Sequence, residues 1–417
     1  MQTRDPVIIV GAGLSGLCCA RRLHQSGIPV HVLDASDGIG GRVRTDQVEG
    51  FLLDRGFQVL LTAYPEAQRV LDYSALDLQA FYPGALVRYA GRFHRVADPW
   101  QHPFDALGSL FSPIGTLSDK WNVGRLRSTL RTKTLEAIFA QPETTTLDAL
   151  RTAGFSDVIV ERFFRPFLSG IFLERDLQTS SRMFAFVFQM FALGGTALPA
   201  GGMAKIPQQL AMALPAGSIQ THTQVTAVEA NTASLSSGEQ LTAQAVVVAT
   251  EEPEALRLVG QDSKRNSCSV TCLYFAADKP PFTEPILVLN AEDQGPVNNL
   301  CIPSNIAPAY TPPGAALISA SVLGEPHRAD QALEDDVRAQ LVEWFGLDAK
   351  RWRHLRTYHI HHALPDQAPP ALSPPERPVQ LASGVYMCGD HLDTASIQGA
   401  MVSGRRAAEA VIADLVE

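Results

Sequence analysis

The sequence predicts an α/β fold in which a parallel-sheet domain is interleaved with a second, α+β domain of antiparallel sheet plus helices. The first observation is a strand at 7–10, a glycine-rich turn, a helix and a second strand at 30–33. Two strands on either side of one helix imply a parallel sheet. The second observation is another strand, turn and helix at 385–415. The third is that long stretches of different character separate the two ends.

The composition is that of a globular protein. The chain has 417 residues, 46% of them hydrophobic, which suits two or three domains built around separate cores. Lys and Arg number 34 against 43 Asp and Glu, so the formal net charge is −9. General nucleic-acid binders are usually basic, and we therefore expect no nucleic-acid partner.

Cysteine usage and hydropathy bear on the compartment. The six cysteines include no C-x-x-C pair, which favours buried thiols over a disulfide framework or a metal site. No segment reaches the ~20 apolar residues that a membrane-spanning helix needs. We expect a cytoplasmic protein that binds no metal, with peripheral membrane association left open.

The elements follow in order along the chain. Leu14, Leu17, Cys18 and Leu23 recur at helical spacing, and Gly27 suits the residue after a helix end. Farther on, the buried run 245–249 is typical of a parallel strand, and the preceding residues 231–238 are rich in turn formers.

The intervening stretches predict the second domain. Residues 96–199 are helix-prone, and a helix is expected at 331–345, stopped by Gly346. Short strands are expected at 273–276, 286–289, 317–322 and 355–361. We therefore predict a first domain made of residues 1–95, 200–267 and 376–417. The predicted second domain comprises residues 96–199 and 268–375, and the Pro-rich stretch 368–378 is the return linker.

A Gly-x-Gly-x-x-Gly turn lies between the first strand and helix. Gly11 permits a tight turn, Gly13 lets the backbone approach a pyrophosphate, and Gly16 lets the helix pack closely. The N–H groups at the helix start, around Leu14 and Ser15, attract phosphate. This predicts a Rossmann-like dinucleotide-binding domain.

An acidic residue at the end of the second strand suits a ribose. Asp34 follows Gly11 by 23 residues, where a carboxylate can accept a hydrogen bond from a 2′-hydroxyl. Ala35 and the next two residues include no Arg, which disfavours a 2′-phosphate.

The next motif separates FAD from NAD. In Gly38-Ile-Gly-Gly-Arg-Val-Arg-Thr45, the pair Gly40-Gly41 lets the chain fold back over the cofactor, and Arg42 can reach its phosphates. The run from Asp34 to Thr45 resembles the FAD fingerprint of the flavin amine oxidase superfamily. That superfamily includes monoamine and polyamine oxidases, protoporphyrinogen oxidases and phytoene desaturase-type enzymes.

The resemblance extends through the chain. It implies that Gly56 and Phe57, in Asp54-Arg-Gly-Phe57, lie beside the isoalloxazine ring, and that backbone at Val225 binds the adenine. Gly389-Asp390 and Ser396–Gly404 resemble the second flavin motif.

Specific roles follow for that second motif. Asp390 can accept a hydrogen bond from a ribityl hydroxyl, and Ser396 suits the N-cap of the last helix. The N–H groups of Ile397 and Gln398 would then face the flavin N1–C2=O edge. No Ser-Gly-Gly-Cys motif precedes the last strand, so non-covalent FAD is expected. The candidate cofactor-binding residues are Gly11, Gly13, Leu14, Ser15, Gly16, Asp34, Ala35, Gly40, Gly41, Arg42, Gly56, Phe57, Val225, Thr250, Gly389, Asp390, Ser396, Ile397, Gln398 and Ala400.

The substrate is less specified. Ser396-Ile-Gln-Gly-Ala400 is closer to the desaturase style than to the Gly-Tyr-x-x-Gly-Ala style of amine oxidases, which wall an amine cage with an aromatic residue. The phenylalanine-rich stretch 155–202 fits an apolar tunnel and a helical core equally well.

The sequence therefore predicts an FAD-dependent oxidase or dehydrogenase of the phytoene desaturase or protoporphyrinogen oxidase type. Hydride would pass from an apolar, isoprenoid or tetrapyrrole-like small molecule to flavin N5, and no catalytic residue is singled out. The alternatives are an amine oxidase acting on a small amine, a carotenoid-type isomerase that needs reduced flavin, and a flavin-binding protein without turnover. The electron acceptor, oxygen or quinone, and the oligomeric state stay open.

One stretch suggests a membrane contact. Residues 120–133 hold five Lys and Arg and no acidic residue, with Trp121 and other apolar side chains interleaved. The hypothesis is an interfacial helix that collects apolar substrate from an anionic membrane; the alternative is an exposed basic helix face.

Overall fold

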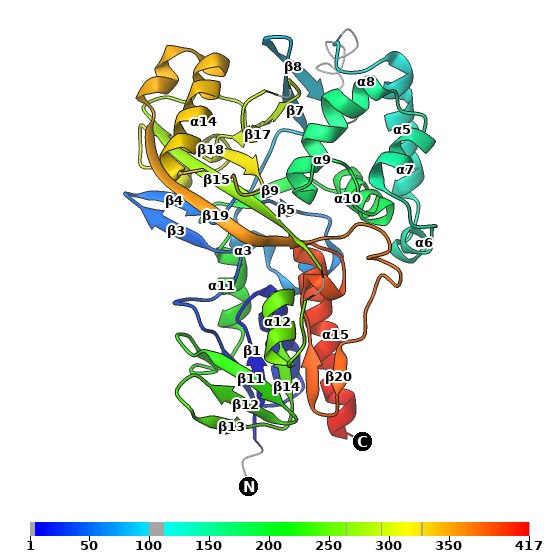
Figure 1. The fold of residues 1–417 in the computed structure, drawn as a ribbon, viewed down its shortest axis with the longest axis vertical. Coiled ribbons are helices and arrows are strands. Elements are labelled where there is room, and N and C mark those ends of the chain that lie inside the picture. Colours follow the sequence, from blue (N-terminus) through cyan, green and yellow to red (C-terminus); the bar gives the residue numbers. More distant parts are fainter. Residues whose placement is uncertain are drawn as a thin grey trace.

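A computed structural model describes residues 5–98, 100, 112–263, 265–292, 294–326 and 328–416. Figure 1 shows an elongated molecule with both chain ends in the same half. A parallel sheet occupies that half, and a larger mixed sheet with flanking helices occupies the other. No helix among the described residues is long and apolar enough to cross a membrane.

The first half is built on a six-stranded sheet in the order β10-β2-β1-β14-β21-β20. Its strands are β1 (Val7–Val10), β2 (Val30–Leu33), β10 (Ile219–Gln220), β14 (Val246–Val248), β20 (Gln380–Ala382) and β21 (Val385–Met387). β1 pairs in parallel with β2 and with β14, and β14 with β21. β1, β14 and β21 are buried along their whole lengths, which explains their uninterrupted apolar sequences.

Helices α1 (Leu14–Gln25) and α15 (Ile397–Val416) bring the two ends of the chain together. Their contact is close because Gly404 has no side chain: a Cβ there would lie 2.1 Å from the carbonyl oxygen of Ser15. The predicted joining of the first and last segments is therefore present in the structure. Short helices α2 (Pro65–Val70), α3 (Tyr73–Leu76), α11 (Lys205–Met212) and α12 (Glu252–Leu258) surround them.

The second half contains a seven-stranded sheet in the order β19-β15-β18-β17-β16-β7-β8. Its strands are β7 (Gly84–Tyr89), β8 (Arg92–Ala97), β15 (Ser267–Ala277), β16 (Leu287–Asn290), β17 (Val297–Cys301), β18 (Ala316–Leu323) and β19 (Arg353–Pro365). Helix α14 (Asp330–Phe345) covers one face, as predicted, and ends at Gly346 with a φ of 87°. The short helix α13 (Pro303–Ile306) precedes β18.

The remaining helices come from the helix-prone stretch. They are α5 (Leu117–Arg131), α6 (Leu135–Phe139), α7 (Thr146–Thr152), α8 (Asp157–Ile159), α9 (Arg165–Phe172) and α10 (Ser181–Leu193). A π-helical turn over Val160–Phe164 joins α8 to α9. Residue 99 and residues 101–111 of that predicted segment lie outside the described residues.

Three smaller sheets complete the fold. They are β3 (Thr45–Val48) with β4 (Phe51–Asp54), β5 (Leu60–Leu61) and β6 (Leu78–Ala80) with β9 (Thr196–Pro199), and β11 (Val225–Glu229), β12 (Thr232–Leu235) and β13 (Gln240–Thr242). The stretch 231–238, expected to be rich in turns, has tight turns at Asn231 and Gly238 with the short strand β12 between them.

Two expectations about domains differ from the structure. β7 and the first part of β8 lie before the boundary at residue 95, in the predicted first domain, but β7 pairs with β16 and β8 pairs with β7 in the large sheet. The cores are also joined: one apolar cluster includes Leu14 of α1, Phe186 of α10 and Cys272 of β15. The division of the chain into domains otherwise stays a prediction.

Candidate functional site

The glycine-rich turn after β1 is held tightly on two sides and open on the third. Gly11 has a φ of 111°, and a Cβ there would lie 2.7 Å from the carbonyl oxygen of Ala249. A Cβ at Gly16 would lie 2.0 Å from the Gly11 oxygen. At Gly13, the N-cap of α1, an added Cβ would meet no atom within 4 Å. The open side is where a phosphate can approach the N–H groups at the start of α1.

Asp34 stands at the end of β2 with its carboxylate already oriented. Its Oδ2 accepts a hydrogen bond from the N–H of Ala12 at 2.7 Å, and its Oδ1 accepts from the N–H and the hydroxyl of Ser36 at 2.8 and 2.6 Å. These donors fix the side chain beside the glycine-rich turn. A carboxylate oxygen has more than one acceptor position, so a sugar hydroxyl can still bind there.

The second glycine pair folds back over the first turn, as expected. The N–H of Gly40 donates to the carbonyl oxygen of Ala12 at 2.8 Å, and Gly40 and Gly13 form an isolated bridge. Gly40 and Gly41 have φ values of 110° and 59°, which favour glycine.

Arg42 has a different neighbour from the one expected. Its guanidinium donates to Asp390 Oδ1 at 2.7 Å and to the carbonyl oxygen of Ala363 at 2.7 Å. Burial lowers the pKa of Arg42, but the attraction of Asp390 outweighs that effect and raises it. Arg42 was predicted to reach the cofactor phosphates and Asp390 a ribityl or phosphate-proximal hydroxyl; in this structure the two side chains bind each other and both line the cavity. The pair closes one side of the site.

Asp54 anchors the segment that follows β4. Its carboxylate accepts hydrogen bonds from Thr45 Oγ1 at 2.5 Å, Tyr310 Oη at 2.8 Å and the N–H of Met203 at 3.0 Å. Burial raises the pKa of Asp54 to about 6, although these donors lower it. Tyr274 Oη also donates to the Asp54 carbonyl oxygen at 2.8 Å. These hydrogen bonds fix the backbone at Asp54, just before Gly56 and Phe57 in the chain.

The start of α15 matches the capping expectation. Ser396 Oγ accepts from the N–H of Gly399 at 3.0 Å, and its carbonyl oxygen accepts from the N–H of Ala400. The N–H groups of Ile397 and Gln398 come earlier in the first turn, where a helix offers no internal acceptor. They are available to a group in front of the helix.

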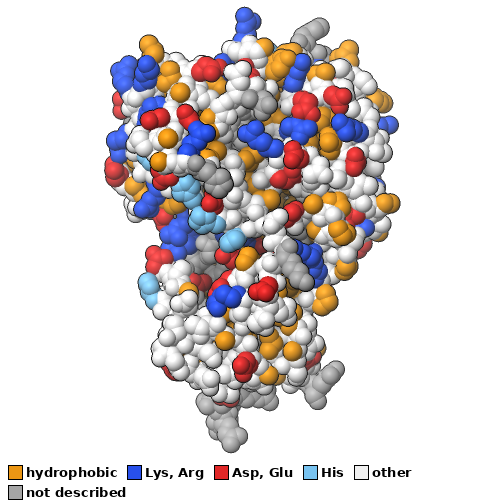
Figure 2. Space-filling model, in the orientation of Figure 1, with side chains coloured by type: hydrophobic (Ala, Val, Ile, Leu, Met, Phe, Trp, Pro, Cys, Tyr) orange, Lys and Arg blue, Asp and Glu red, His pale blue; other side chains and the backbone are white. Residues whose placement is uncertain are grey.

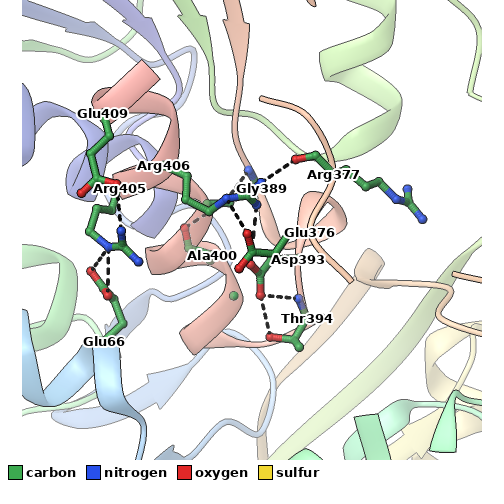
Figure 3. Close-up of polar contacts among 12 residues, drawn as sticks. Glu66, Glu376, Arg377, Gly389, Asp393, Thr394, Ala400, Arg405, Arg406 and Glu409 are labelled. Carbon is green, nitrogen blue, oxygen red and sulfur yellow. Dashed lines mark hydrogen bonds and ion pairs between the residues drawn. The ribbon is translucent and has the colours of Figure 1, made fainter. Parts of the chain in front are cut away.

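Polar contacts hold α15 in place (Figure 3). Arg405 pairs with Glu66 at 3.2 Å and with Glu409 at 2.9 Å, which links α15 to α2. Arg406 contacts Asp393 Oδ2 at 3.8 Å, and burial raises the pKa of Asp393 to about 6. This network fixes the direction in which the helix N-terminus points.

A single cavity of about 610 Å³ connects these pieces. The candidate residues that line it are Gly11, Gly13, Leu14, Ser15, Asp34, Gly40, Gly41, Arg42, Gly56, Phe57, Thr250, Gly389, Asp390, Ser396, Ile397 and Ala400. The structure thus brings together residues from the first, middle and last parts of the chain.

Four candidates lie outside that lining. Gly16 packs α1 against the turn, and Ala35 is exposed beyond Asp34. Val225, the first residue of β11, is buried in the core. The side chain of Gln398 accepts a hydrogen bond from the N–H of Glu66 at 2.9 Å and so supports α2. Any cofactor role of Val225 or Gln398 therefore rests on backbone groups and stays a prediction.

Sequence reasoning missed Gln58. Its Nε2 donates to the carbonyl oxygens of Arg42 at 2.7 Å and Arg55 at 3.2 Å, which fixes the orientation of the amide. Its Oε1 is buried without a partner among the described residues, and the residue lines the cavity. The unpaired Oε1 can accept a hydrogen bond from a bound dinucleotide, and the open face of Gly13 leaves room for its phosphates. Both features therefore fit a dinucleotide in the cavity. No sequence motif marks Gln58 for this role.

A comparison with known families decides what kind of site this is. The sequence model for "Flavin containing amine oxidoreductase" matches residues 14–412. The chain belongs to this family. This match confirms the resemblance to the flavin amine oxidase superfamily. Solved structures of the same fold confirm the predicted α/β fold with parallel and antiparallel sheets.

Solved structures match this oxidoreductase over nearly its whole length. An oxidoreductase from Methanosarcina mazei has a TM-score of 0.76 at 18% identity, covering 97% of this chain and 100% of that one. Cyclohexylamine oxidase from Brevibacterium oxydans IH-35A has a TM-score of 0.72 at 18% identity, covering 100% of both chains. At this identity the likeness concerns the fold alone.

Curated relatives of the oxidoreductase match over short segments. Polyamine oxidase 2 of Arabidopsis thaliana is 47% identical over 57 residues, which are 13% of this chain and 12% of that protein. Protoporphyrinogen oxidase 2, chloroplastic/mitochondrial, of the same plant is 35% identical over 77 residues, 18% and 15%. 4,4'-Diaponeurosporene oxygenase of Staphylococcus haemolyticus is 43% identical over 63 residues, 15% and 12%. The chain thus spans only a small part of the length of these relatives.

The part of the cavity formed by α9, α10 and the large sheet is largely apolar. It is lined by Ile171 of α9, by residues of α10 and, from the large sheet, by Val270, Ser321 and Ile360. The α10 residues that line it are Met183, Val187 and Phe191. Most phenylalanines of the 155–202 stretch lie in the core instead, among them Phe164, Phe184 and Phe186.

The histidines of β19 contact neighbouring side chains. Figure 2 shows pale-blue histidine side chains in a diagonal row across one face of the molecule. His359 contacts Asp330 at 2.9 Å, His361 contacts Glu325, and His362 Nδ1 lies 2.5 Å from Ser267 Oγ. Among the described residues, no cluster of three or more His, Cys, Asp or Glu can hold a metal ion.

Proposed function

We propose that this protein binds FAD non-covalently and oxidises an apolar small molecule. Bound in the cavity, FAD would accept a hydride at N5 from a C–H or C–N bond of the substrate. The start of α1 would hold the pyrophosphate, Asp34 the adenosine ribose, and the first turn of α15 the flavin N1–C2=O edge. The substrate would lie between Phe57 and the walls from α9, α10 and the large sheet.

The charge distribution of the cavity carries this proposal. Its charged lining residues are Asp34, Arg42, Arg55, Glu251, Glu254 and Asp390. These belong to the Gly-rich segments and the ends of β2, β4, β14 and β21. Among the described lining residues from α9, α10 and the large sheet, none is charged. A protonated amine placed there would lack a partner, whereas a neutral substrate would lose little by leaving water.

The residues beside the α15 N-terminus also bear on an amine substrate. Ala395 and Ser396 line the cavity where the amine oxidase pattern has an aromatic residue. A cation is stabilised by aromatic faces, and Ala395 and Ser396 supply none. The desaturase-like or protoporphyrinogen oxidase-like activity is therefore proposed ahead of the amine oxidase and isomerase alternatives. A cytoplasmic location and a small-molecule partner remain predictions.

Anaerobic mixing tests the proposal. The purified protein should be yellow, and denaturation should release free FAD into solution. Bleaching of the oxidised flavin by a neutral polyene such as phytoene, or by protoporphyrinogen, is expected, with no bleaching by putrescine. Bleaching by putrescine alone would support the amine oxidase. Turnover of a polyene only after dithionite reduction, with no net oxidation, would support the isomerase.

A further inference from the structure

The two faces of the seven-stranded sheet differ in chemistry. Along β15 and β18, one set of alternate residues packs under α14, including Leu273, Phe275 and Ile318. The intervening residues face the opposite way. They include Cys272, Tyr274, Ser319 and Ser321, all buried. A buried sheet face that carries hydroxyl and thiol groups needs hydrogen-bond partners for them.

Ser321 is the residue of this face that lacks such a partner. Its side chain is 4% exposed, it lines the cavity, and its Oγ is buried without a hydrogen bond to any described residue. Ser319, two residues earlier on the same face, has its Oγ 3.4 Å from Cys272 Sγ. Leaving a buried hydroxyl without a hydrogen bond destabilises the folded protein. A group that enters the cavity can remove this cost.

The position of Ser321 relates it to the reacting end of the site. It is paired with Cys272 of β15, and the backbone of Phe57 lies next to the Cys272 side chain. Val270 and Ile360 lie on the same sheet and also line the cavity. The Ile360 side chain is next to Gly56: a Cβ added at Gly56 would lie 3.2 Å from Ile360 Cδ1. Ser321 thus lies in the apolar part of the cavity, close to the segment expected beside the flavin.

We propose that the Ser321 hydroxyl binds a neutral oxygen substituent of the substrate. The preferred substrate is then an apolar molecule that carries a hydroxyl, carbonyl or ether oxygen, which should bind more tightly than a plain hydrocarbon of the same size. A charged group does not suit the position, because the described lining around Ser321 has no counter-ion. The inference rests on the proposed function, since it assigns the apolar part of the cavity to the substrate.

A matched pair of ligands tests the inference on the FAD-loaded full chain. The probes are geraniol and myrcene, an isoprenoid alcohol and a hydrocarbon of equal carbon number, and binding is followed by the change in flavin absorbance without turnover. Ser321→Ala should weaken geraniol binding about 5- to 10-fold and leave myrcene binding unchanged. Ser321→Cys, of similar size but with a poor hydrogen-bonding group, should show the same selective loss. Ser319→Ala is the matched control and should alter neither affinity.

The outcomes separate the two proposals. Equal losses for both probes, or no loss of geraniol binding in either Ser321 variant, would overturn the assignment of Ser321 while leaving the apolar substrate site intact. Loss of FAD from both variants would show that the hydroxyl serves the cofactor, and would also overturn it. Failure of myrcene and geraniol alike to bind the wild-type protein would remove the apolar substrate site itself, and the role of Ser321 with it.

Discussion

Gly13 allows the cofactor's approach to be separated from folding. Its backbone has φ −72° and ψ 178°, which any residue adopts, and an added Cβ would meet no protein atom within 4 Å. Gly13→Ala should therefore fold normally but place a methyl group where the pyrophosphate must lie. We expect FAD affinity to fall at least 10-fold with the melting temperature of the apoprotein unchanged, as measured by FAD titration and calorimetry.

A second glycine provides the contrast for that experiment. A Cβ at Gly16 would lie 2.0 Å from the Gly11 carbonyl oxygen. Gly16→Ala should destabilise the apoprotein itself. If Gly13→Ala lowered the apoprotein melting temperature as much as Gly16→Ala, the open face of Gly13 would not be a cofactor site.

Asp54 should make stability depend on pH in a defined direction. Its pKa is raised from 3.8 to about 6 by burial. Between these values the folded protein keeps a proton that the unfolded chain has released, so the free energy of unfolding falls as pH rises. Asp54→Asn removes this contribution. Chemical unfolding at pH 4 and pH 7 should show the variant gaining about 3 kcal/mol relative to wild type at the higher pH.

The pH dependence of the free energy of unfolding decides that prediction. A constant difference between wild type and Asp54→Asn across the pH range would mean that Asp54 titrates at its ordinary pKa. The Thr45, Tyr310 and Met203 donors would then outweigh burial.

At the residue scale, the sequence identified the glycines and Asp34 because their spacing reflects local geometry. It did not reveal the Arg42–Asp390 pair, since 348 residues separate the two and either could have contacted a cofactor instead. Gln58 and Ser321 carry no motif either. Each has a buried atom without a partner among the residues that the structure describes, a feature that depends on the three-dimensional fold and leaves no mark in the sequence.

Among the elements, α5 tests the membrane hypothesis. The helix is present, with Leu117 69% and Trp121 76% exposed one turn apart. Arg127, however, pairs with Asp98 at 3.0 Å and lies over the Trp100 ring. The positive charge of this surface is therefore smaller than the sequence run suggested.

Vesicle flotation measures whether the remaining surface suffices. Wild-type protein should float with phosphatidylserine vesicles at low salt and dissociate at high salt. Trp121→Glu should lower the bound fraction several-fold, whereas Leu347→Glu, at an equally exposed apolar residue after α14, should not. Equal binding by both variants, or none by wild type, would contradict a membrane contact through α5.

Elements with a strong local sequence pattern were predicted well, and features that depend on strand pairing far along the chain were predicted less well. The strands β1, β2 and β14 and the helices α1, α14 and α15 follow their sequence patterns closely. β17 was missed because its residues Val297–Cys301 include two asparagines, which are uncommon in strands. β7 fell within the predicted first domain although it pairs with β16, because strand pairing over about 200 residues leaves no local signal.

For the molecule as a whole, the cofactor should act as a clamp. The cavity is lined by residues from the first and the last segments, which come together only in the folded protein. A dinucleotide should therefore bind the folded state and not the unfolded chain, and so stabilise the fold. At a hundredfold excess over its Kd, FAD should add about 2.7 kcal/mol. Calorimetry should show a melting temperature several degrees higher with FAD than with riboflavin, which lacks the phosphates and adenosine. An equal effect of the two ligands would contradict the assignment of the glycine-rich turn.

The order of the segments could be predicted because motifs at both ends fix it. The joined core could not, since Leu14, Phe186 and Cys272 meet only after the segments fold against one another. Apolar residues show that a core exists, but they do not show which core each will join.

The packing of α15 on α1 has a consequence for biosynthesis. Gly404 touches the first turn of α1, and Ser396 to Ala400 complete the cavity wall, yet α15 leaves the ribosome after every other element described here. A nascent chain that has made only the glycine-rich turn holds half a site. Coenzyme capture should therefore await synthesis of α15, and a cell short of riboflavin would accumulate protein whose site is assembled but empty.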